Sequence, residues 1–221
     1  MKVNHKKTII FDMDGTLYKF KGDSFRNSGL YGVVIENTVS YICNKLGKTK
    51  LEAQEVLDAI LKKYGNSISI GLENEFKIDR YDYFNSVWNI NAKKYVKFDS
   101  TISAFLLELQ KNFDLVLLSD APVIWISRVL DYLGIMEIFK NNIFSGEGDA
   151  RKEFGNAFEK ICKTMNIKVN RCIVIGDQEE TDIIPAKKIG MKAVFIGKSK
   201  NSIADYTINN IHELKKLVNK L

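Results

Sequence analysis

Histidine and cysteine are scarce in this chain of 221 residues, and their scarcity excludes several kinds of active site. His5 and His212 are the only histidines, and they lie near opposite ends of the chain. A Ser/His/Asp triad or a histidine-rich metal site therefore has almost no raw material. Cys43, Cys162 and Cys172 are odd in number and scattered, which favours reduced thiols over a disulfide framework. Any chemistry must then rest on carboxylates, a hydroxyl group and a lysine.

Long apolar runs are also missing from the sequence. No stretch approaches the roughly 20 residues that a helix needs to cross a bilayer, and the segment ahead of the first apolar strand is too short for a signal peptide. We therefore expect a cytoplasmic protein without a membrane partner. The net charge of +6 comes from lysines dispersed among acidic residues, which predicts a solvated surface and no nucleic-acid polymer as partner.

An apolar segment, Thr8 to Phe11, runs directly into two carboxylates that are separated by one residue, Asp12 and Asp14. Alternate side chains of an extended chain point the same way, so the two can converge if the backbone turns sharply at Gly15. Two close carboxylates repel each other. The pair therefore indicates a divalent cation that offsets the charge, or a carboxyl whose raised pKa lets it hold a proton. Taken alone, the pattern is equally typical of a solvated strand end.

Three more apolar segments have the character of buried strands and lead into polar or glycine residues. The first, Phe113 to Leu118, leads into Ser119 and Asp120. The second, Cys172 to Ile175, leads into Gly176 and Asp177, with Asp182 five residues further on, and the third, Ala193 to Ile196, leads into Gly197. Apolar residues recur at helical spacing in the stretches 122–134, 154–165 and 182–189. Alternating strands and helices predict an α/β fold whose parallel sheet is covered on both faces. Ligands bind such sheets outside the carboxyl ends of the strands, so the acids are predicted to converge there.

The stretch from Lys19 to Asp99 does not follow this alternation. Its apolar residues form separate stripes at helical spacing: Ile35, Val39, Ile42 and Leu46; Val56, Leu57, Ile60, Leu61 and Tyr64; and Tyr83, Phe84, Val87 and Trp88. Thr49 followed by Glu52 predicts a capping box that opens the second helix, and Gly65 closes it. We therefore expect a small helical insert in the core.

With these residues in place, the chain resembles a phosphatase of the haloacid dehalogenase superfamily. Four motifs of that family are matched in order: Asp12-Met13-Asp14-Gly15-Thr16, then Ser119, then Lys152, then Gly176-Asp177 with Asp182. The third motif is a lysine, and Lys152 fits because it precedes a helix and stands six residues before Phe158, as is common in relatives. Arg151 and Lys160 are the neighbouring basic alternatives.

The resemblance implies a Rossmann-like three-layer core with a parallel sheet, formed by residues 1–18 and 100–221. Residues 19–99, with linkers at 20–29 and 89–99, are expected to form an α-helical cap of the C1 type, which closes over the site and helps to choose the substrate. Part of this cap, from Tyr64 to Tyr83, is locally similar to pyrimidine 5′-nucleotidase-like members. A nucleoside monophosphate is therefore the leading substrate expectation, with sugar phosphates and phosphoglycolate close behind.

The resemblance also implies a role for each acid. Asp12 attacks phosphorus to form an aspartyl phosphate, and Asp14 protonates the leaving oxygen and then activates water. Asp12, the backbone carbonyl of Asp14 and Asp177 supply oxygen ligands to Mg²⁺. Asp182 orients Lys152 or a metal-bound water.

The phosphoryl group itself is expected to be bound by hydroxyl, backbone and ammonium donors. These belong to Gly15, Thr16, Ser119, Asp120 and Lys152. Asp120 stands where the family often has asparagine, so backbone N–H groups are expected to replace its side chain as the phosphate contact.

The second acid of the first motif helps to separate reaction classes. A dehalogenase lacks this acid because it has no alkoxide leaving group to protonate, so Asp14 disfavours dehalogenation. The sequence therefore predicts a Mg²⁺-dependent phosphatase that acts on a small phosphorylated metabolite. A phosphomutase or phosphotransferase with the same motifs, and a non-enzymatic regulator that binds a small ligand, are the alternatives. The sequence leaves the oligomeric state open.

Overall fold

The computed structural model describes residues 6–147, 151–152, 156–198 and 202–221. His5 lies outside these residues, and so does Phe154, where the helix predicted over 154–165 was expected to start. The described strands form one sheet in the order β3-β2-β1-β4-β5-β6, and all neighbouring strands are parallel. The strands are β1 (Lys7–Phe11), β2 (Phe113–Ser119), β3 (Ile143–Ser145), β4 (Cys172–Gly176), β5 (Lys192–Ile196) and β6 (Tyr206–Ile208).

The strand order reverses at the centre of the sheet. From β1 the chain proceeds outward through β2 to β3, and it then returns to the other side of β1 as β4 before it continues to β5 and β6. Phe11, at the carboxyl end of β1, is opposite Leu117 of β2 and Ile175 of β4. The carboxyl ends of these three strands therefore frame the crevice in which ligands of such sheets bind.

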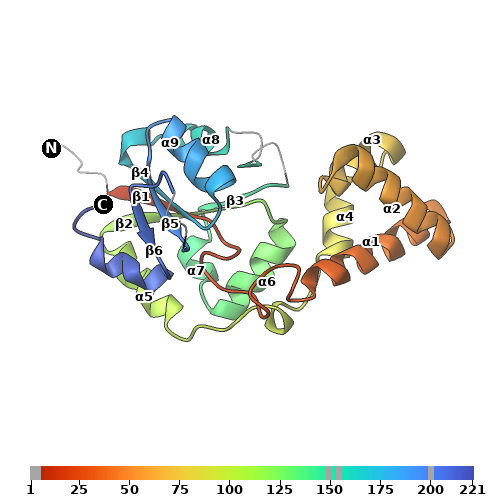
Figure 1. The fold of residues 1–221 in the computed structure, drawn as a ribbon, viewed down its shortest axis with the longest axis horizontal. Coiled ribbons are helices and arrows are strands. Elements are labelled where there is room, and N and C mark those ends of the chain that lie inside the picture. Colours follow the sequence, from red (N-terminus) through yellow and green to blue (C-terminus); the bar gives the residue numbers. More distant parts are fainter. Residues whose placement is uncertain (1–5, 148–150, 153–155, 199–201) are drawn as a thin grey trace.

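Both faces of the sheet are apolar because alternate strand residues point to opposite sides. Ile9 and Phe11 belong to one apolar core, and Ile10 belongs to another. Helices α5 (Ile102–Gln110), α6 (Val123–Leu133) and α7 (Met136–Phe139) lie on one side, and α8 (Ala157–Met165) and α9 (Ile184–Lys188) on the other (Figure 1). The core also has the 3-10 helices η3 (Val169–Arg171) and η5 (Ile211–Lys216). These three layers confirm the predicted fold class.

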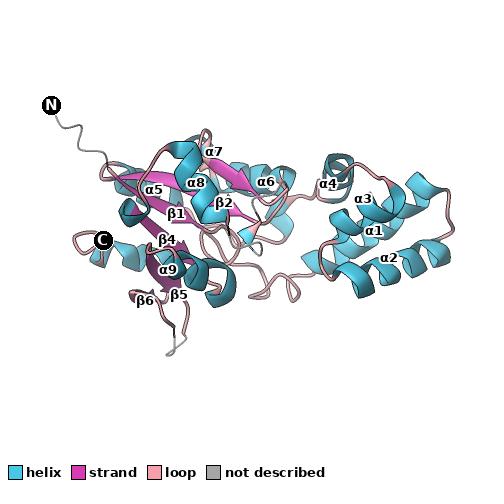
Figure 2. Ribbon diagram, turned by 90° about the horizontal axis from the view of Figure 1, so that it is seen from above, coloured by secondary structure: helices cyan, strands magenta, loops and turns pink. Residues whose placement is uncertain are grey.

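Four helices form a separate bundle beside the core, seen from two directions in Figures 1 and 2. They are α1 (Leu30–Leu46), α2 (Lys50–Tyr64), α3 (Ile68–Phe76) and α4 (Arg80–Val87). Thr49 and Glu52 form the predicted capping box at the start of α2. Helix α3 was not predicted. Gly71 lets it lie close to α2, since a Cβ atom at that position would stand 2.6 Å from Ile60 Cγ2.

The two segments that join this bundle to the core run side by side. Phe20 and Val96 form an antiparallel bridge, and the backbone N–H of Lys97 donates to the carbonyl of Lys19 at 2.9 Å. A 3-10 turn, η1 (Ala92–Lys94), lies in the second segment. Paired segments restrict the bundle to motions that both can follow. No helix of the described residues is long and apolar enough to cross a bilayer.

The helix expected from Asp182 to Ile189 differs from the prediction at its start. It begins earlier, as a π-helical turn, η4 (Glu179–Ile183), and α9 continues it. The backbone N–H groups of Asp182 and Ile183 both donate to Gln178 O, at 3.0 and 3.3 Å. Such widened turns are frequent at functional sites, and this one directs the Asp182 carboxylate toward Lys152.

Candidate active site

Three side chains with catalytic potential stand at the carboxyl ends of the central strands. Asp12 follows β1, Ser119 is the last residue of β2, and Asp177 follows β4. The parallel ladder extends as far as Asp12, whose backbone N–H donates to Ile175 O at 2.9 Å. The sheet therefore brings together side chains that are far apart in the sequence.

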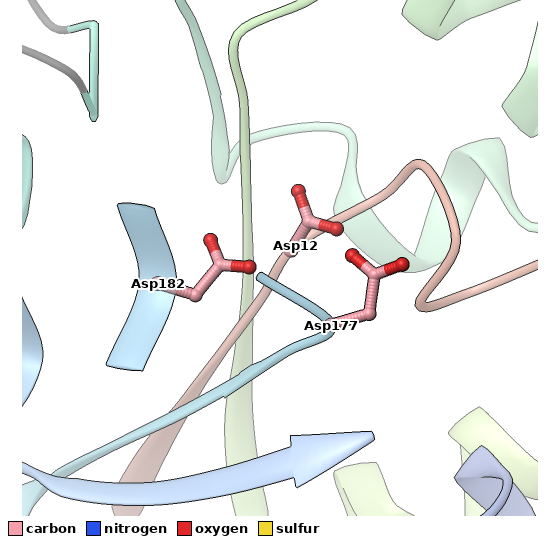
Figure 3. Close-up of side chains that lie close together, drawn as sticks. All are labelled: Asp12, Asp177 and Asp182. Atoms are coloured by element: carbon pink, nitrogen blue, oxygen red, sulfur yellow. The ribbon is translucent and has the colours of Figure 1, made fainter. Parts of the chain in front are cut away.

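Asp12, Asp177 and Asp182 form a cluster of carboxylates, which we call the acid cluster (Figure 3). One oxygen atom from each residue lies within 4.8 Å of the others. Gly15 makes this approach possible. Its φ is +87°, and a Cβ atom there would stand 2.0 Å from Asp177 Oδ2. Any other residue at position 15 would therefore displace Asp177 from the cluster.

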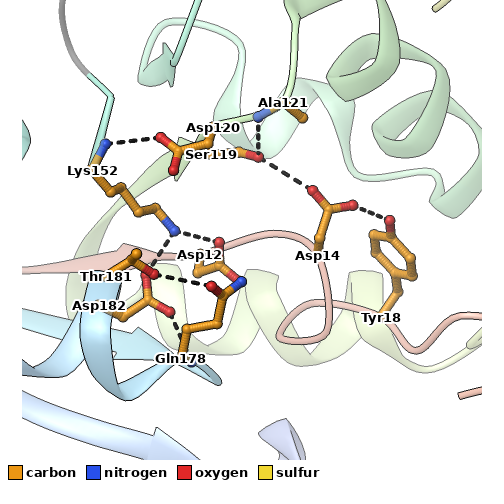
Figure 4. A network of polar contacts seen from close by, with 10 residues as sticks. All are labelled: Asp12, Asp14, Tyr18, Ser119, Asp120, Ala121, Lys152, Gln178, Thr181 and Asp182. Atoms are coloured by element: carbon orange, nitrogen blue, oxygen red, sulfur yellow. Dashed lines mark hydrogen bonds and ion pairs between the residues drawn. The ribbon is translucent and has the colours of Figure 1, made fainter. Parts of the chain in front are cut away.

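Lys152 lies against the acid cluster and is only 4% exposed. Its ammonium group contacts Asp12 Oδ1 at 2.5 Å and Asp182 Oδ1 at 2.7 Å (Figure 4). Burial lowers the pKa of Lys152, but the two carboxylates raise it above its usual value, so the ammonium keeps its charge. The backbone N–H of Lys152 donates to Asp120 Oδ1 at 2.8 Å. Asp120 therefore anchors the lysine, a role that the sequence analysis did not predict.

The Asp14 carboxyl lies in different surroundings. Its Oδ1 accepts hydrogen bonds from the Tyr18 hydroxyl and, at 3.3 Å, from Trp125 Nε1. Its Oδ2 accepts from Ser119 Oγ at 3.4 Å (Figure 4). Burial raises the pKa of Asp14 to about 6, although the hydrogen bond from Tyr18 lowers it. A carboxyl with this pKa can hold and release a proton near neutral pH.

The acid cluster also resists full ionisation. Burial, followed by the charge of Asp12, raises the pKa of Asp177 to about 7. Burial likewise raises the pKa of Asp182 to about 6, although Lys152 lowers it. Positive charge beyond that of Lys152 would lower these pKa values and keep the carboxylates ionised.

The donor set of the acid cluster fits a divalent cation. Two buried oxygen atoms, Asp12 Oδ2 and Asp177 Oδ1, have no hydrogen-bond partner among the described residues. Both oxygens of Asp182, in contrast, have partners. Oδ1 accepts from the Lys152 ammonium, and Oδ2 accepts from the Gln178 N–H at 3.1 Å. Buried carboxylate oxygens without partners are costly, and Mg²⁺ prefers oxygen ligands. Asp12 and Asp177 are therefore the residues best placed to hold the ion.

Gly15 and Asp120, which are expected at the phosphate, line the same cavity as Asp14 and Asp177. Ser119 is buried, and its Oγ accepts from the Ala121 N–H at 3.1 Å. Thr16 is buried, and its hydroxyl has no hydrogen-bond partner within the described parts of the chain. Of the basic alternatives to Lys152, Arg151 donates to Ser67 Oγ at 2.8 Å, and Lys160 lies within α8.

A cavity of about 460 Å³ extends from Asp14 and Asp177 to the α1–α4 bundle. The rings of Phe25 and Trp88 are stacked at its wall, with centroids 6.1 Å apart and planes 7° apart. Its other aromatic residues are Phe20, Tyr83, Phe84 and Trp125, and its polar residues beyond the acids of the site include Lys19, Ser24, Asn66, Ser69 and Arg151. The cavity therefore offers both apolar faces and hydrogen-bonding groups to a bound molecule.

Sequence reasoning missed the partners of Asp14. Tyr18 lies only four residues further along the chain, so its proximity was a usable signal. Trp125 belongs to α6, and no spacing in the sequence connects it with Asp14.

Comparison with known proteins extends these observations. Residues 6–190 match the family described as haloacid dehalogenase-like hydrolase. The glyceraldehyde 3-phosphate phosphatase of Methanocaldococcus jannaschii is 28% identical over 97% of this chain and 98% of that protein. The N-acylneuraminate-9-phosphatase of Rattus norvegicus is 23% identical over 100% of this chain and 97% of that protein. In fold, a HAD phosphatase from Thermococcus onnurineus matches with a TM-score of 0.65, at 21% identity over 96% of this chain and 97% of that one.

The parallel sheet, with a cluster of carboxylates and a buried lysine at its carboxyl edge, defines an α/β protein. Because the matched region spans most of the chain, the protein belongs to the haloacid dehalogenase-like hydrolase family. The two relatives named above are phosphatases, and the protein is a phosphatase enzyme of this family.

Proposed function

We propose that the protein hydrolyses a small phosphate monoester with Mg²⁺ bound, through a phosphoryl group carried on Asp12. The supporting observation is the pairing of two carboxyls with different surroundings. Asp12 lies against the Lys152 ammonium, and Asp14, two residues further on, has a pKa raised by burial to about 6. Phosphoryl transfer by this route needs a nucleophile, positive charge and an acid, and these residues supply all three.

In the first step an oxygen of Asp12 attacks phosphorus, and the bond between phosphorus and the leaving oxygen breaks. Asp14 gives its proton to that oxygen, so the leaving group departs as an alcohol. The Lys152 ammonium and the Ser119 hydroxyl stabilise the negative charge of the phosphoryl group. When bound at Asp12 and Asp177, Mg²⁺ supplies further positive charge.

In the second step Asp14 acts in the opposite direction. It is now ionised, and it takes a proton from a water molecule while the water oxygen attacks phosphorus. The bond between phosphorus and Asp12 breaks, inorganic phosphate leaves, and Asp14 is protonated again. The same carboxyl thus serves as acid and then as base, which its raised pKa allows.

The substrate class that we propose is a phosphorylated sugar or sugar-derived acid. The relatives named above act on glyceraldehyde 3-phosphate and N-acylneuraminate 9-phosphate. In support, polar side chains that suit hydroxyl and carboxyl groups line the cavity, among them Lys19, Asn66, Ser69 and Arg151. A nucleoside monophosphate is the second candidate, because the stacked rings of Phe25 and Trp88 give the cavity an apolar aromatic wall.

We propose that the two parts of the chain have separate roles, as the sequence leads us to expect. Residues 1–18 and 100–221 act as the catalytic core, and residues 19–99 act as a cap that selects the ester. The cavity supports this, since α1, α3 and α4 contribute Val34, Ile68 and Phe84 to its wall. The three cysteines are free, which accords with a cytoplasmic location.

A phosphate-release assay tests the proposed function. Glyceraldehyde 3-phosphate, N-acylneuraminate 9-phosphate, phosphoglycolate and a pyrimidine nucleoside monophosphate are each supplied with Mg²⁺ or with EDTA. We expect release only with Mg²⁺, with the highest kcat/KM on a sugar-type ester. Highest kcat/KM on the nucleotide would favour the second candidate. Transfer of the phosphoryl group to sugar in place of release would indicate a mutase, and binding without turnover of any ester would contradict the proposed function.

A further inference from the structure

Tyr18 makes a polar contact that its position among apolar side chains does not require. It lies on the segment after β1, is 4% exposed, and packs edge-on against Phe20 with ring centroids 5.1 Å apart. A backbone bridge between Asp14 and Tyr18 holds the two residues together. The Tyr18 hydroxyl donates to Asp14 Oδ1 (Figure 4). A phenylalanine would fill the same apolar space, so packing alone does not account for the hydroxyl.

Trp125 acts on the same oxygen from another direction. It belongs to α6, is 1% exposed, and its Nε1–H donates to Asp14 Oδ1 at 3.3 Å. An indole N–H can only donate. With a phenol and an indole both directed at it, Oδ1 is the oxygen least able to carry a proton.

The other oxygen of the carboxyl, Oδ2, accepts one hydrogen bond, which is long. Asp14 Oδ2 accepts from Ser119 Oγ at 3.4 Å, which is longer than either hydrogen bond to Oδ1. Ser119 ends β2 at the crevice that also holds Asp12. Oδ2 therefore faces Ser119 and accepts one hydrogen bond among the described residues, whereas Oδ1 accepts two.

From this asymmetry we infer that Tyr18 and Trp125 are positioning residues for the acid. They hold the Asp14 carboxyl so that Oδ2 gives its proton to the leaving oxygen as the phosphorus–oxygen bond breaks, and so that Oδ2 later receives the proton of the attacking water. The inference rests on the proposed function of Asp14. It assigns to this chain two residues that act on the reaction without touching the phosphoryl group.

The test compares two esters that need the acid to different degrees. An alkyl phosphate has a poor leaving group that must be protonated, whereas a dinitrophenyl phosphate has a good leaving group that departs as the anion. We expect Tyr18→Phe to lower kcat/KM on the alkyl ester about ten- to hundredfold and on the dinitrophenyl ester by less than about twofold, because only the first needs a positioned acid. Tyr41→Phe is the matched control, since Tyr41 is also buried but donates to Asp82 in the α1–α4 bundle.

Equal losses on both esters, or no loss on the alkyl ester, in a Tyr18→Phe protein that unfolds at the wild-type temperature would overturn the inference. Trp125→Phe is measured as a second variant and should show the same selective loss. Asp14→Asn separates this inference from the proposed function. If Asp14→Asn slows the first step, measured as release of the leaving group in a single turnover, selectively on the alkyl ester while Tyr18→Phe does not, only the positioning role is wrong. If Asp14→Asn releases the alkyl leaving group at the wild-type rate, the proposed function itself is wrong.

Discussion

Surroundings, more than residue type, set the chemistry of each carboxyl in this protein. Burial raises the pKa of Asp14 to about 6 and the pKa of Asp177 to about 7. Asp23 is an aspartate of the same cavity wall, but it is exposed, and a hydrogen bond with Lys97 lowers its pKa. The first two can exchange protons near neutral pH, whereas Asp23 stays ionised.

The raised pKa of Asp177 predicts how stability depends on pH without a divalent cation. Its folded-state pKa of about 7 lies above the ordinary value of 3.8. The folded protein therefore binds this proton more tightly than the unfolded chain does. The resulting stabilisation of the folded state is complete below pH 3.8 and is lost as the pH rises through about 7. In EDTA, the Tm of the wild type relative to that of Asp177→Asn should fall across this range. Mg²⁺ should raise the wild-type Tm most at the upper end.

Asp58→Asn is the control for this measurement, because Asp58 is exposed on α2 and accepts a hydrogen bond from Gln54. It should leave both the pH dependence and the Mg²⁺ effect as in the wild type. A constant Tm difference between the wild type and Asp177→Asn across the range would show that Asp177 does not titrate as described.

At the scale of residues, the sequence predicted that Asp12, Asp177 and Asp182 meet, but not what holds them. It also placed the Asp14 carboxyl beside Asp12, whereas this carboxyl accepts from Tyr18 and Trp125 outside the acid cluster. Asp12 and Asp177 converge because each follows a central parallel strand, and the apolar runs before them are visible in the sequence. The hydrogen bond from the Lys152 backbone to Asp120 joins two loops that are far apart in the sequence. Contacts of that kind depend on loop geometry, on which apolar periodicity carries no information.

At the scale of elements, the buried strands were the ones that could be predicted from the sequence. Strands β1, β2, β4 and β5 were predicted because their long apolar runs pack on both faces of the sheet. Strands β3 and β6 were not, since they lie at the two edges, have three residues each and include polar side chains. The capping box of α2 was predicted because its signal is local.

That capping box makes a prediction about stability alone. The Thr49 side chain accepts from the Glu52 N–H, and the Glu52 carboxylate accepts from the Thr49 N–H at 2.8 Å. Thr49→Ala removes one of these bonds and should lower the Tm by about 2 to 4 °C, with kcat/KM unchanged. Thr49→Ser keeps the hydroxyl and should remain close to the wild type. An unchanged Tm for Thr49→Ala would mean that tertiary packing alone holds the start of α2.

At the scale of the whole molecule, the α1–α4 bundle and the core meet around one cavity. Arg128 of α6 donates to Asn89 Oδ1 with its Nη2 at 2.7 Å, and Arg151 donates to Ser67 Oγ at 2.8 Å. These bonds and the paired linkers join the two parts. The sequence predicted the insert from its helical periodicity, but the contacts across the cavity connect distant segments and could not be inferred from it.

The central claim is that Asp12 carries the phosphoryl group, and trapping that group tests it most directly. Asp14→Asn mixed with dinitrophenyl phosphate and Mg²⁺ should complete the first step without an acid and stall at the second, which needs the base. After an acid quench, we expect a mass gain of one phosphoryl group, located on the peptide that contains Asp12 and absent when Asp12 is also changed to Asn. Stoichiometric release of dinitrophenol with no phosphoryl group on the protein, or with the group on another residue, would contradict the account.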